Sequence, residues 1–240
     1  MRDLLFEDGG AVGLSAPKRG EAAERTRGGR VVVEGTTKAG EPFVTVFEKE
    51  DEDEKELAAV LSRELAAFAT RIGAGELRSV LVAGLGNPRI DVDSLGSLAA
   101  LRVTAGAAGR RKVGSVGIGV PEQTGIASAE LVAAAAAVVD ADLVIAVDSL
   151  AALAPERLCS VIQIAGGVIP GSGADGGSRG INSATVGRPV VTVGTPTAVK
   201  GRLSKGGSGA DGLFTVCGIA GQVAFHAGVI ASAIDSFLAE

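Results

Sequence analysis

The 240-residue sequence contains no tryptophan, no tyrosine, two cysteines and a single histidine. Two thiols, Cys159 and Cys217, are too few for a disulfide framework, which indicates a reducing compartment such as the cytoplasm. His226 stands alone and far in sequence from any nucleophile, so we expect a packed or surface residue there and no Ser/His or Cys/His catalysis. Because these three residues also lack the spacing of a zinc site, we expect no metal and no other cofactor.

The sequence also has little that would direct it to a nucleic acid or a membrane. Its net charge is −5, and we expect the short basic run 110–112 to be a solvated loop, so no direct contact with nucleic acid is expected. The longest apolar run, 131–139, is too short to span a bilayer. Residues 1–7 lack the apolar core of a signal peptide. We therefore expect an intracellular protein that makes no membrane contact.

What is present is a chain that is 46% hydrophobic and has 36 glycines. Its length fits a single α/β domain over 1–240, with an N-terminal arm and hairpin over about 1–50. Within that region, 8–29 is expected to be a loose arm or long loop, because it is rich in glycine and charge. Strands at 31–33 and 43–47 are expected to form the hairpin, through a turn at 37–40.

A helix is predicted to begin at the acidic run 51–54, where carboxylates suit the positive end of the helix dipole. Its buried stripe is marked by apolar residues three and four apart: Leu57, Leu61, Leu65, Phe68 and Ile72.

From Ser79 onward, apolar strands alternate with helices. The expected strands are 80–83, 113–120, 143–147 and 190–193. The expected helices are 93–103, 129–139 and 221–239, the last with Val223, Ile230, Ile234 and Phe237 facing inward. This alternation predicts an α/β fold with a mostly parallel, mixed sheet that is flanked by helices on both faces.

In such sheets, function gathers at the carboxyl ends of the strands. Gly84-Leu85-Gly86-Asn87 follows the first core strand directly. The dinucleotide pattern G-x-G-x-x-G would need glycine at position 89, where this sequence has arginine after a proline, so a tight loop is the better interpretation.

Two aspartates stand at these positions and have structural alternatives. Asp93 is either a helix N-cap or a functional carboxylate, and Asp91 competes with it for both roles. Asp148 comes after the second strand, as either a satisfied structural aspartate or a functional one. If strands 80–83 and 143–147 are neighbours, the two carboxylates can face each other and share one proton. One could then activate water while the other protonates a carbonyl oxygen or a leaving amine.

Several motifs in one order resemble those of the spore germination protease family. Gly84-Leu85-Gly86-Asn87 and Asp93-Ser94-Leu95-Gly96 resemble its G-L-G-N and D-A-L-G. The segment 144–152 resembles V-I-A-I-D-A-L-A-A, and Pro170-Gly171-Ser172-Gly173 resembles P-G-S-G. The similarity continues through 124–126, 156–157, 162–164, 187–191 and 194–197.

The resemblance implies an aspartic-type endopeptidase that degrades small acid-soluble spore proteins at germination, in the cytoplasm of the spore core or forespore. It implies Asp93 and Asp148 as catalytic residues. It suggests four substrate-binding residues: Asn87, Thr124, Gln163 and Ser172. It further implies a phosphorylase/hydrolase-like fold, similar to that of hydrogenase-maturation proteases, and a possible homo-oligomer.

The sequence departs from this family at several points. Leu153 replaces an arginine, Ala127 replaces a glutamate, and the histidine of I-H-P-G-S-G is missing before Pro170. Family members are made with an N-terminal propeptide, whereas almost nothing precedes Arg2 here, so control by a removable N-terminus is not expected. A hydrogenase-maturation-type endopeptidase and a non-catalytic spore-associated binding protein of the same fold are the alternatives.

Overall fold

The computed structural model describes residues 22–36, 40–108, 110–152, 154–166, 180–203 and 210–239. Its strands are β1 (Ala22–Arg27), β2 (Arg30–Thr36), β3 (Pro42–Phe47), β4 (Ser79–Leu85), β5 (Gly106–Ala108), β6 (Arg111–Gly119), β7 (Leu143–Ala152), β8 (Val161–Ala165), β9 (Val190–Leu203) and β10 (Ala210–Phe214). Its helices are α1 (Glu54–Arg71), α2 (Leu95–Arg102), α3 (Pro121–Thr124), α4 (Ser128–Val139), α5 (Ser183–Val186) and α6 (Ile219–Ala239), with 3-10 turns η1 (Asp91–Asp93) and η2 (Pro155–Arg157).

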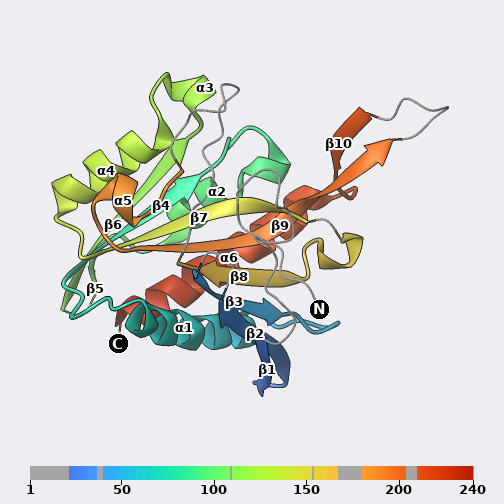
Figure 1. The fold of residues 1–240 in the computed structure, drawn as a ribbon, viewed down its shortest axis with the longest axis horizontal. Coiled ribbons are helices and arrows are strands. Elements are labelled where there is room, and N and C mark those ends of the chain that lie inside the picture. The colour runs from blue at the N-terminus through green and yellow to red at the C-terminus, as the bar shows by residue number, and fades with distance from the viewer. Residues whose placement is uncertain are drawn as a thin grey trace.

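Within the described residues, the strands form one mixed sheet in the order β1-β2-β3-β8-β9-β7-β4-β6-β5, and β10 pairs with β9 (Figure 1). The centre, β6-β4-β7-β9, is parallel. The strands on both sides of it pair antiparallel. The predicted α/β class with a mixed sheet is therefore confirmed, and antiparallel strands extend its parallel centre.

Helices cover both faces of this sheet, as predicted. Alternate residues of a strand point to opposite faces. Val82 and Ile145 belong to the larger apolar cluster, together with residues of α1, α2 and α6. Ala83 and Val144 belong to a second cluster with residues of α4. In Figure 1, α4 lies above the central strands and α1 below them.

The N-terminal region is more ordered than the sequence suggested. The expected hairpin of β2 and β3 is confirmed, but the prediction of a loose arm over 8–29 is wrong for its last part, because 22–27 form β1. Arg25 explains why so polar a segment is held: its guanidinium donates to both carboxylate oxygens of the buried Glu64 in α1, at 2.8 and 2.5 Å. The ion pair between Arg27 and Glu64, at 3.2 Å, adds a second charge to this attachment.

Helix α1 begins as the acidic run predicted. Asp53 is its N-cap, and the side chain accepts a hydrogen bond from the backbone N–H of Glu56. The stripe from Leu57 to Phe68 is buried, and Ile72 packs against the same cluster.

Helix α6 passes through the main core. Among the described helices, α6 alone is long and apolar enough to cross a membrane, judged by length and composition only. Its predicted inward residues, however, are buried in the larger apolar cluster. His226 lies in this helix and is completely buried. Its Nδ1 lies 2.7 Å from the carbonyl oxygen of Gln222, and its Nε2 lies 2.5 Å from Oε1 of Glu48. Of the two alternatives expected for His226, a packed or a surface residue, the structure shows the packed one.

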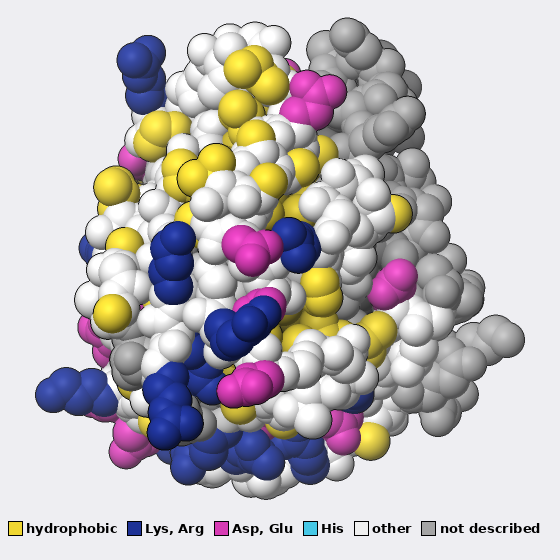
Figure 2. All heavy atoms as spheres, turned by 90° about the vertical axis from the view of Figure 1, so that its left-hand side faces the viewer, with side chains coloured by type: hydrophobic (Ala, Val, Ile, Leu, Met, Phe, Trp, Pro, Cys, Tyr) yellow, Lys and Arg dark blue, Asp and Glu magenta, His cyan; other side chains and the backbone are white. Residues whose placement is uncertain are grey.

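The basic run 110–112 is not a loop, contrary to the prediction, because Arg111 and Lys112 belong to β6. Arg111 donates to the carbonyl oxygens of Phe237 and Leu238, at 3.3 and 2.9 Å, where it complements the negative end of α6. The face at the amino ends of the parallel strands, seen in Figure 2, carries basic and acidic side chains side by side. The ion pair of Arg188 with Asp140 is one such pair of charges.

Candidate active site

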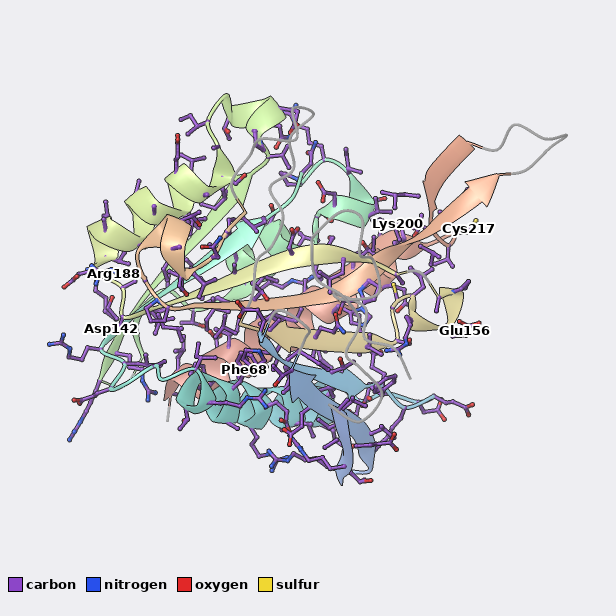
Figure 3. The ribbon with its side chains drawn as sticks, viewed as in Figure 1. Phe68, Asp142, Glu156, Arg188, Lys200 and Cys217 are labelled. Atoms are coloured by element: carbon purple, nitrogen blue, oxygen red, sulfur yellow. The ribbon has the colours of Figure 1, made fainter. Side chains whose placement is uncertain are left out.

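The candidate site lies where β4 and β7 run side by side. The two strands pair in parallel from Val80↔Leu143 to Gly84↔Val147, which confirms the adjacency on which the two-aspartate hypothesis depended. In Figure 3 the parallel strands run from the side of Asp142 and Arg188 toward that of Lys200 and Glu156, so this site lies at their carboxyl edge.

Asp148 does not follow the end of its strand, as the sequence suggested. β7 continues to Ala152, and Asp148 pairs with Gly194 of β9 inside that ladder. The strand was expected to end because its apolar run ends at Val147. Pairing with β9 carries it further, and the carboxylate accepts a hydrogen bond at 2.8 Å from the backbone N–H of Ser149.

Asp93 is not a helix N-cap. It ends the 3-10 turn η1, and Ser94 occupies the N-cap position of α2 without a side-chain capping bond. The carboxylate of Asp93 instead turns back toward β4 and accepts a hydrogen bond at 2.6 Å from the backbone N–H of Asn87. Asp91, the competing carboxylate, is exposed in the same turn. The loop after β4 therefore orients Asp93, not Asp91.

Three glycines allow η1 and α2 to approach the strands this closely. A Cβ atom on Gly84 would lie 2.1 Å from the carbonyl oxygen of Gly96, and one on Gly96 would lie 2.1 Å from that of Val147. Gly86 has a φ of +88°, and a Cβ there would lie 2.0 Å from the carbonyl oxygen of Asp93. These contacts are with backbone atoms, so no rotamer change relieves them. The glycines of the two motifs thus set the position of Asp93 above β4 and β7.

Hydrogen bonds from three elements fix the turn and the loop before it. Thr197 of β9, whose side chain is buried, donates to the carbonyl oxygen of Val92 at 2.5 Å. Ser97 of α2 donates to the carbonyl oxygen of Gly86 at 3.2 Å. On the other side, the side chain of Gln123 in α3 donates to Oδ1 of Asn87 at 2.7 Å. The loop that carries Asp93 is therefore held by β9, α2 and α3 together.

The surroundings favour the protonated form of both aspartates. Burial, and then the negative charge of Asp93, raise the pKa of Asp148 from its usual value to about 7, although the side chain keeps some solvent contact. Burial also raises the pKa of Asp93, the hydrogen bond from Asn87 opposes this, and the charge of Glu122 adds to it. Asp148 therefore holds a proton for part of the time at neutral pH, beside a second carboxyl group.

Such a pair has the properties that acid–base hydrolysis requires. A carboxylic acid with a pKa near the working pH can give up a proton and take it back at low cost. A neighbouring ionised carboxylate can remove a proton from water. Because the charge of one group shifts the pKa of the other, the apparent pKa values belong to the pair.

The structure places the predicted substrate-binding residues at different depths. Asn87 lies beside Asp93. Thr124 is exposed at the end of α3, and its hydroxyl bonds to the carbonyl oxygen of Ile126 at 3.0 Å. Gln163 is completely buried in β8, where it donates to the hydroxyl of Thr45 at 3.0 Å. It shares a row of the sheet with Asp148, because both residues pair with Gly194.

Ser172, the rest of the 170–173 motif, Leu153 and residues 1–21 lie outside the described residues. Ala127 is at the N-cap position of α4 and makes no side-chain capping bond. The described residues contain no group of three or more His, Cys, Asp or Glu side chains that could hold a metal ion.

Sequence reasoning missed the contributions of Glu122, Gln123 and Thr197. Each reaches the site from an element far along the chain, so spacing within a motif carried no signal for them. The role of Gly96 had a signal that was not used: glycine at the second position of a helix, one turn from a candidate catalytic residue, indicates close packing.

Comparison with known proteins agrees with the geometry. A profile described as Germination protease, peptidase family A25, matches residues 38–204. The germination protease of Bacillus pumilus is 32% identical over 82% of this chain and 58% of its own length. That of Bacillus subtilis is 34% identical over 64% of this chain and 45% of its own length.

The chain thus spans about half the length of the curated relatives it matches. Among solved structures, a [NiFe] hydrogenase maturation protease, HycI from Thermococcus kodakarensis, matches 72% of this chain and 99% of its own, with 20% identity and a TM-score of 0.42. The family match over most of the chain, with Asp93 and Asp148 brought to one edge of the sheet, shows that this protein belongs to the germination protease family.

Proposed function

We propose that this protein is an endopeptidase that hydrolyses peptide bonds in small acid-soluble spore proteins at germination, with Asp93 and Asp148 as a general acid/base pair. The observation that carries the proposal is the parallel pairing of β4 with β7, which brings Asp93 and Asp148 to one edge of the sheet. The raised pKa values of both aspartates, and the contribution of the charge of Asp93 to that of Asp148, support it. Membership of the germination protease family supports the substrate class. The site of action would be the cytoplasm of the forespore or the spore core, and a homo-oligomer is the proposed assembly.

In the proposed reaction, one carboxylate removes a proton from water, which attacks the scissile carbonyl carbon. The protonated partner donates its proton to the carbonyl oxygen, which gives a neutral tetrahedral intermediate with two hydroxyl groups. As the C–N bond breaks, the carboxyl group that took a proton from water donates it to the leaving amine, and the ionised partner takes a proton back from one of the hydroxyl groups. The shared proton thereby returns to the pair at the end of the cycle. The short hydrogen bond from Asn87 orients one oxygen of Asp93 and leaves the other for water.

The test is cleavage of a purified small acid-soluble spore protein, followed by mass spectrometry. Asp93→Asn and Asp148→Asn keep the side-chain shape but remove the ionisable group, and each should lower the rate by about 10²- to 10⁴-fold. Asp91→Asn is the matched control, because Asp91 is exposed in the same turn and should leave the rate unchanged.

The other outcomes separate the alternatives. Cleavage that persists in both variants would show that the two aspartates are structural. An intact substrate in the presence of well-folded wild-type protein would favour the non-catalytic binding protein. Cleavage of a hydrogenase precursor in a nickel-dependent manner would favour the maturation endopeptidase.

A further inference from the structure

The strand that carries Asp148 is longer than its neighbour on one side. Pairing between β4 and β7 ends at Gly84↔Val147. On the other side, β7 remains paired with β9 as far as Ala152↔Val199. In the described part of the chain, the stretch Asp148–Ala152 therefore has no strand partner on its β4 side. This open edge lies within the sheet, next to the catalytic aspartates, and not at its outer border.

An unpaired strand edge presents backbone N–H and C=O groups that can pair with another chain. Asp148, Ser149, Leu150 and Ala151 all keep some solvent contact. The hydroxyl of Ser149 is buried and has no hydrogen-bond partner. The open edge thus has an unmet side-chain hydroxyl at Ser149, while the backbone N–H of the same residue donates to the Asp148 carboxylate.

The side chain of Leu150 leaves this edge free. A Cβ atom on Gly194, in β9, would lie 2.8 Å from Cγ of Leu150. The leucine therefore leans over β9, on the side away from β4. On the β4 side, the chain does not continue the ladder after Gly84, because η1 is attached to β9, where the carbonyl oxygen of Val92 accepts a hydrogen bond from Thr197 at 2.5 Å. The position of a continued β4 is the place beside Asp148–Ala152 that no described strand takes.

We propose that an extended segment of the protein substrate occupies this position and pairs with β7 along Asp148–Ala152. Main-chain hydrogen bonds would supply affinity, and the alternate side chains of the segment would supply selectivity. The scissile bond would lie at the end of the added strand, beside Asp93 and Asp148. This inference rests on the proposed endopeptidase function and names how that site holds its substrate.

The position of the edge favours substrate over a second copy of the chain. The unpaired stretch begins at Asp148 itself, so whatever pairs there is delivered to the catalytic carboxyl group. The outer strands β1 and β5 are poor candidates for insertion, because β1 is rich in charge and β5 spans only Gly106–Ala108. An extended substrate segment meets no such restriction.

The first test is amide hydrogen exchange in Asp93→Asn, with and without an excess of a small acid-soluble spore protein. Among the amides of 150–152, those that point toward the open edge should exchange at least about 10-fold more slowly in the complex, whereas that of Ser149 already donates to Asp148 in the free protein. Amides within 144–147, which are already paired on both sides, serve as the internal control and should not change. The matched cleavage assay with wild-type protein is run on the same substrate.

The combined result separates this inference from the proposed function. Cleavage by the wild type with unchanged exchange over 150–152 would overturn the pairing but not the endopeptidase. Neither cleavage nor a change in exchange would overturn both. Slower exchange that depends on protein concentration, without any spore protein, would show that a second copy occupies the edge and would also overturn the proposal.

A second test uses substrate peptides in which single backbone amides are replaced by esters, which removes one N–H donor at a time. A paired strand directs every second N–H toward its neighbour. Each of these replacements should lower kcat/KM by about 2- to 10-fold, and the replacements between them should have little effect. A profile without this alternation would contradict strand pairing.

Discussion

Replacing Gly96 by alanine should displace the turn η1, which carries Asp93, without changing either of the two aspartates proposed as catalytic. The added Cβ would lie 2.1 Å from the carbonyl oxygen of Val147 and 2.5 Å from the backbone nitrogen of Leu85. Relief requires α2 to move away from β4 and β7 by about 1 Å. Such overpacking typically costs about 1–3 kcal/mol, partly offset by the roughly 1 kcal/mol that alanine gains over glycine in a helix. We expect the free energy of unfolding to fall by about 2 kcal/mol at most.

The effect on activity should be larger than the effect on stability. The turn η1, which ends at Asp93, leads directly into α2. A displacement of α2 by about 1 Å should therefore also move Asp93, and should lower kcat/KM by roughly 100-fold. Gly221→Ala is the matched control: Gly221 is also helical, a Cβ there meets nothing within 4 Å, and the change should be neutral or stabilising. Urea unfolding and peptide cleavage would measure the two quantities. A Gly96→Ala protein as stable and as active as the wild type would refute the close-packing argument.

Three further predictions concern charged groups. The folded-state pKa of Asp148 is raised from 3.8 to about 7, so its stabilising contribution is complete below pH 3.8 and is lost as the pH rises to 7. As the pH rises, the free energy of unfolding of Asp148→Asn should therefore increase relative to that of the wild type, by at most about 4 kcal/mol. Urea unfolding at pH 4 to 8 would measure this, and a difference in stability that does not change with pH would contradict it. Glu122→Gln should lower the pKa of Asp93 and so move the acidic limb of the pH–rate profile to lower pH, with a smaller shift at high salt. An acidic limb that does not move would mean that the charges of Glu122 and Asp93 do not interact. Arg157 is buried without an ion pair in the described chain and stacks on Phe47 at 5.0 Å, so Arg157→Met should leave the melting temperature unchanged or raise it; a large decrease would indicate an essential role for the charge.

The elements that the sequence predicted best are those whose own side chains determine them. The stripe of α1 and the apolar runs of β4 and β7 follow from local periodicity, and the structure has them at nearly the predicted positions. β1 was not predicted, because a segment of charged and small residues becomes a strand only through β2 and the attachment of Arg25 to Glu64. The secondary structure of such a segment is determined by its tertiary contacts and not by local propensity.

The candidate site likewise has features that could be predicted from the sequence and features that could not. Asp93 and Asp148 could be selected because each comes after an apolar run that predicts a strand of a parallel sheet. The orientation of Asp93 could not, since it depends on a backbone donor at Asn87 and on a hydroxyl at Thr197 from a strand about a hundred residues later. The sequence likewise carried no sign that β7 continues past β4, because that extension is set by pairing with β9.

The attachment of β3 to β8 has a consequence for how the chain matures on the ribosome. The bond between Gln163 and Thr45 joins residues 118 positions apart. At a synthesis rate of about 5–20 residues per second, β3 waits roughly 6–24 seconds for its partner. During that interval the nascent chain exposes the inner edge of β3 to other polypeptides. Sequestration of this edge by a chaperone, or its early cover by α1, would decide how much of the newly made protein reaches the native sheet.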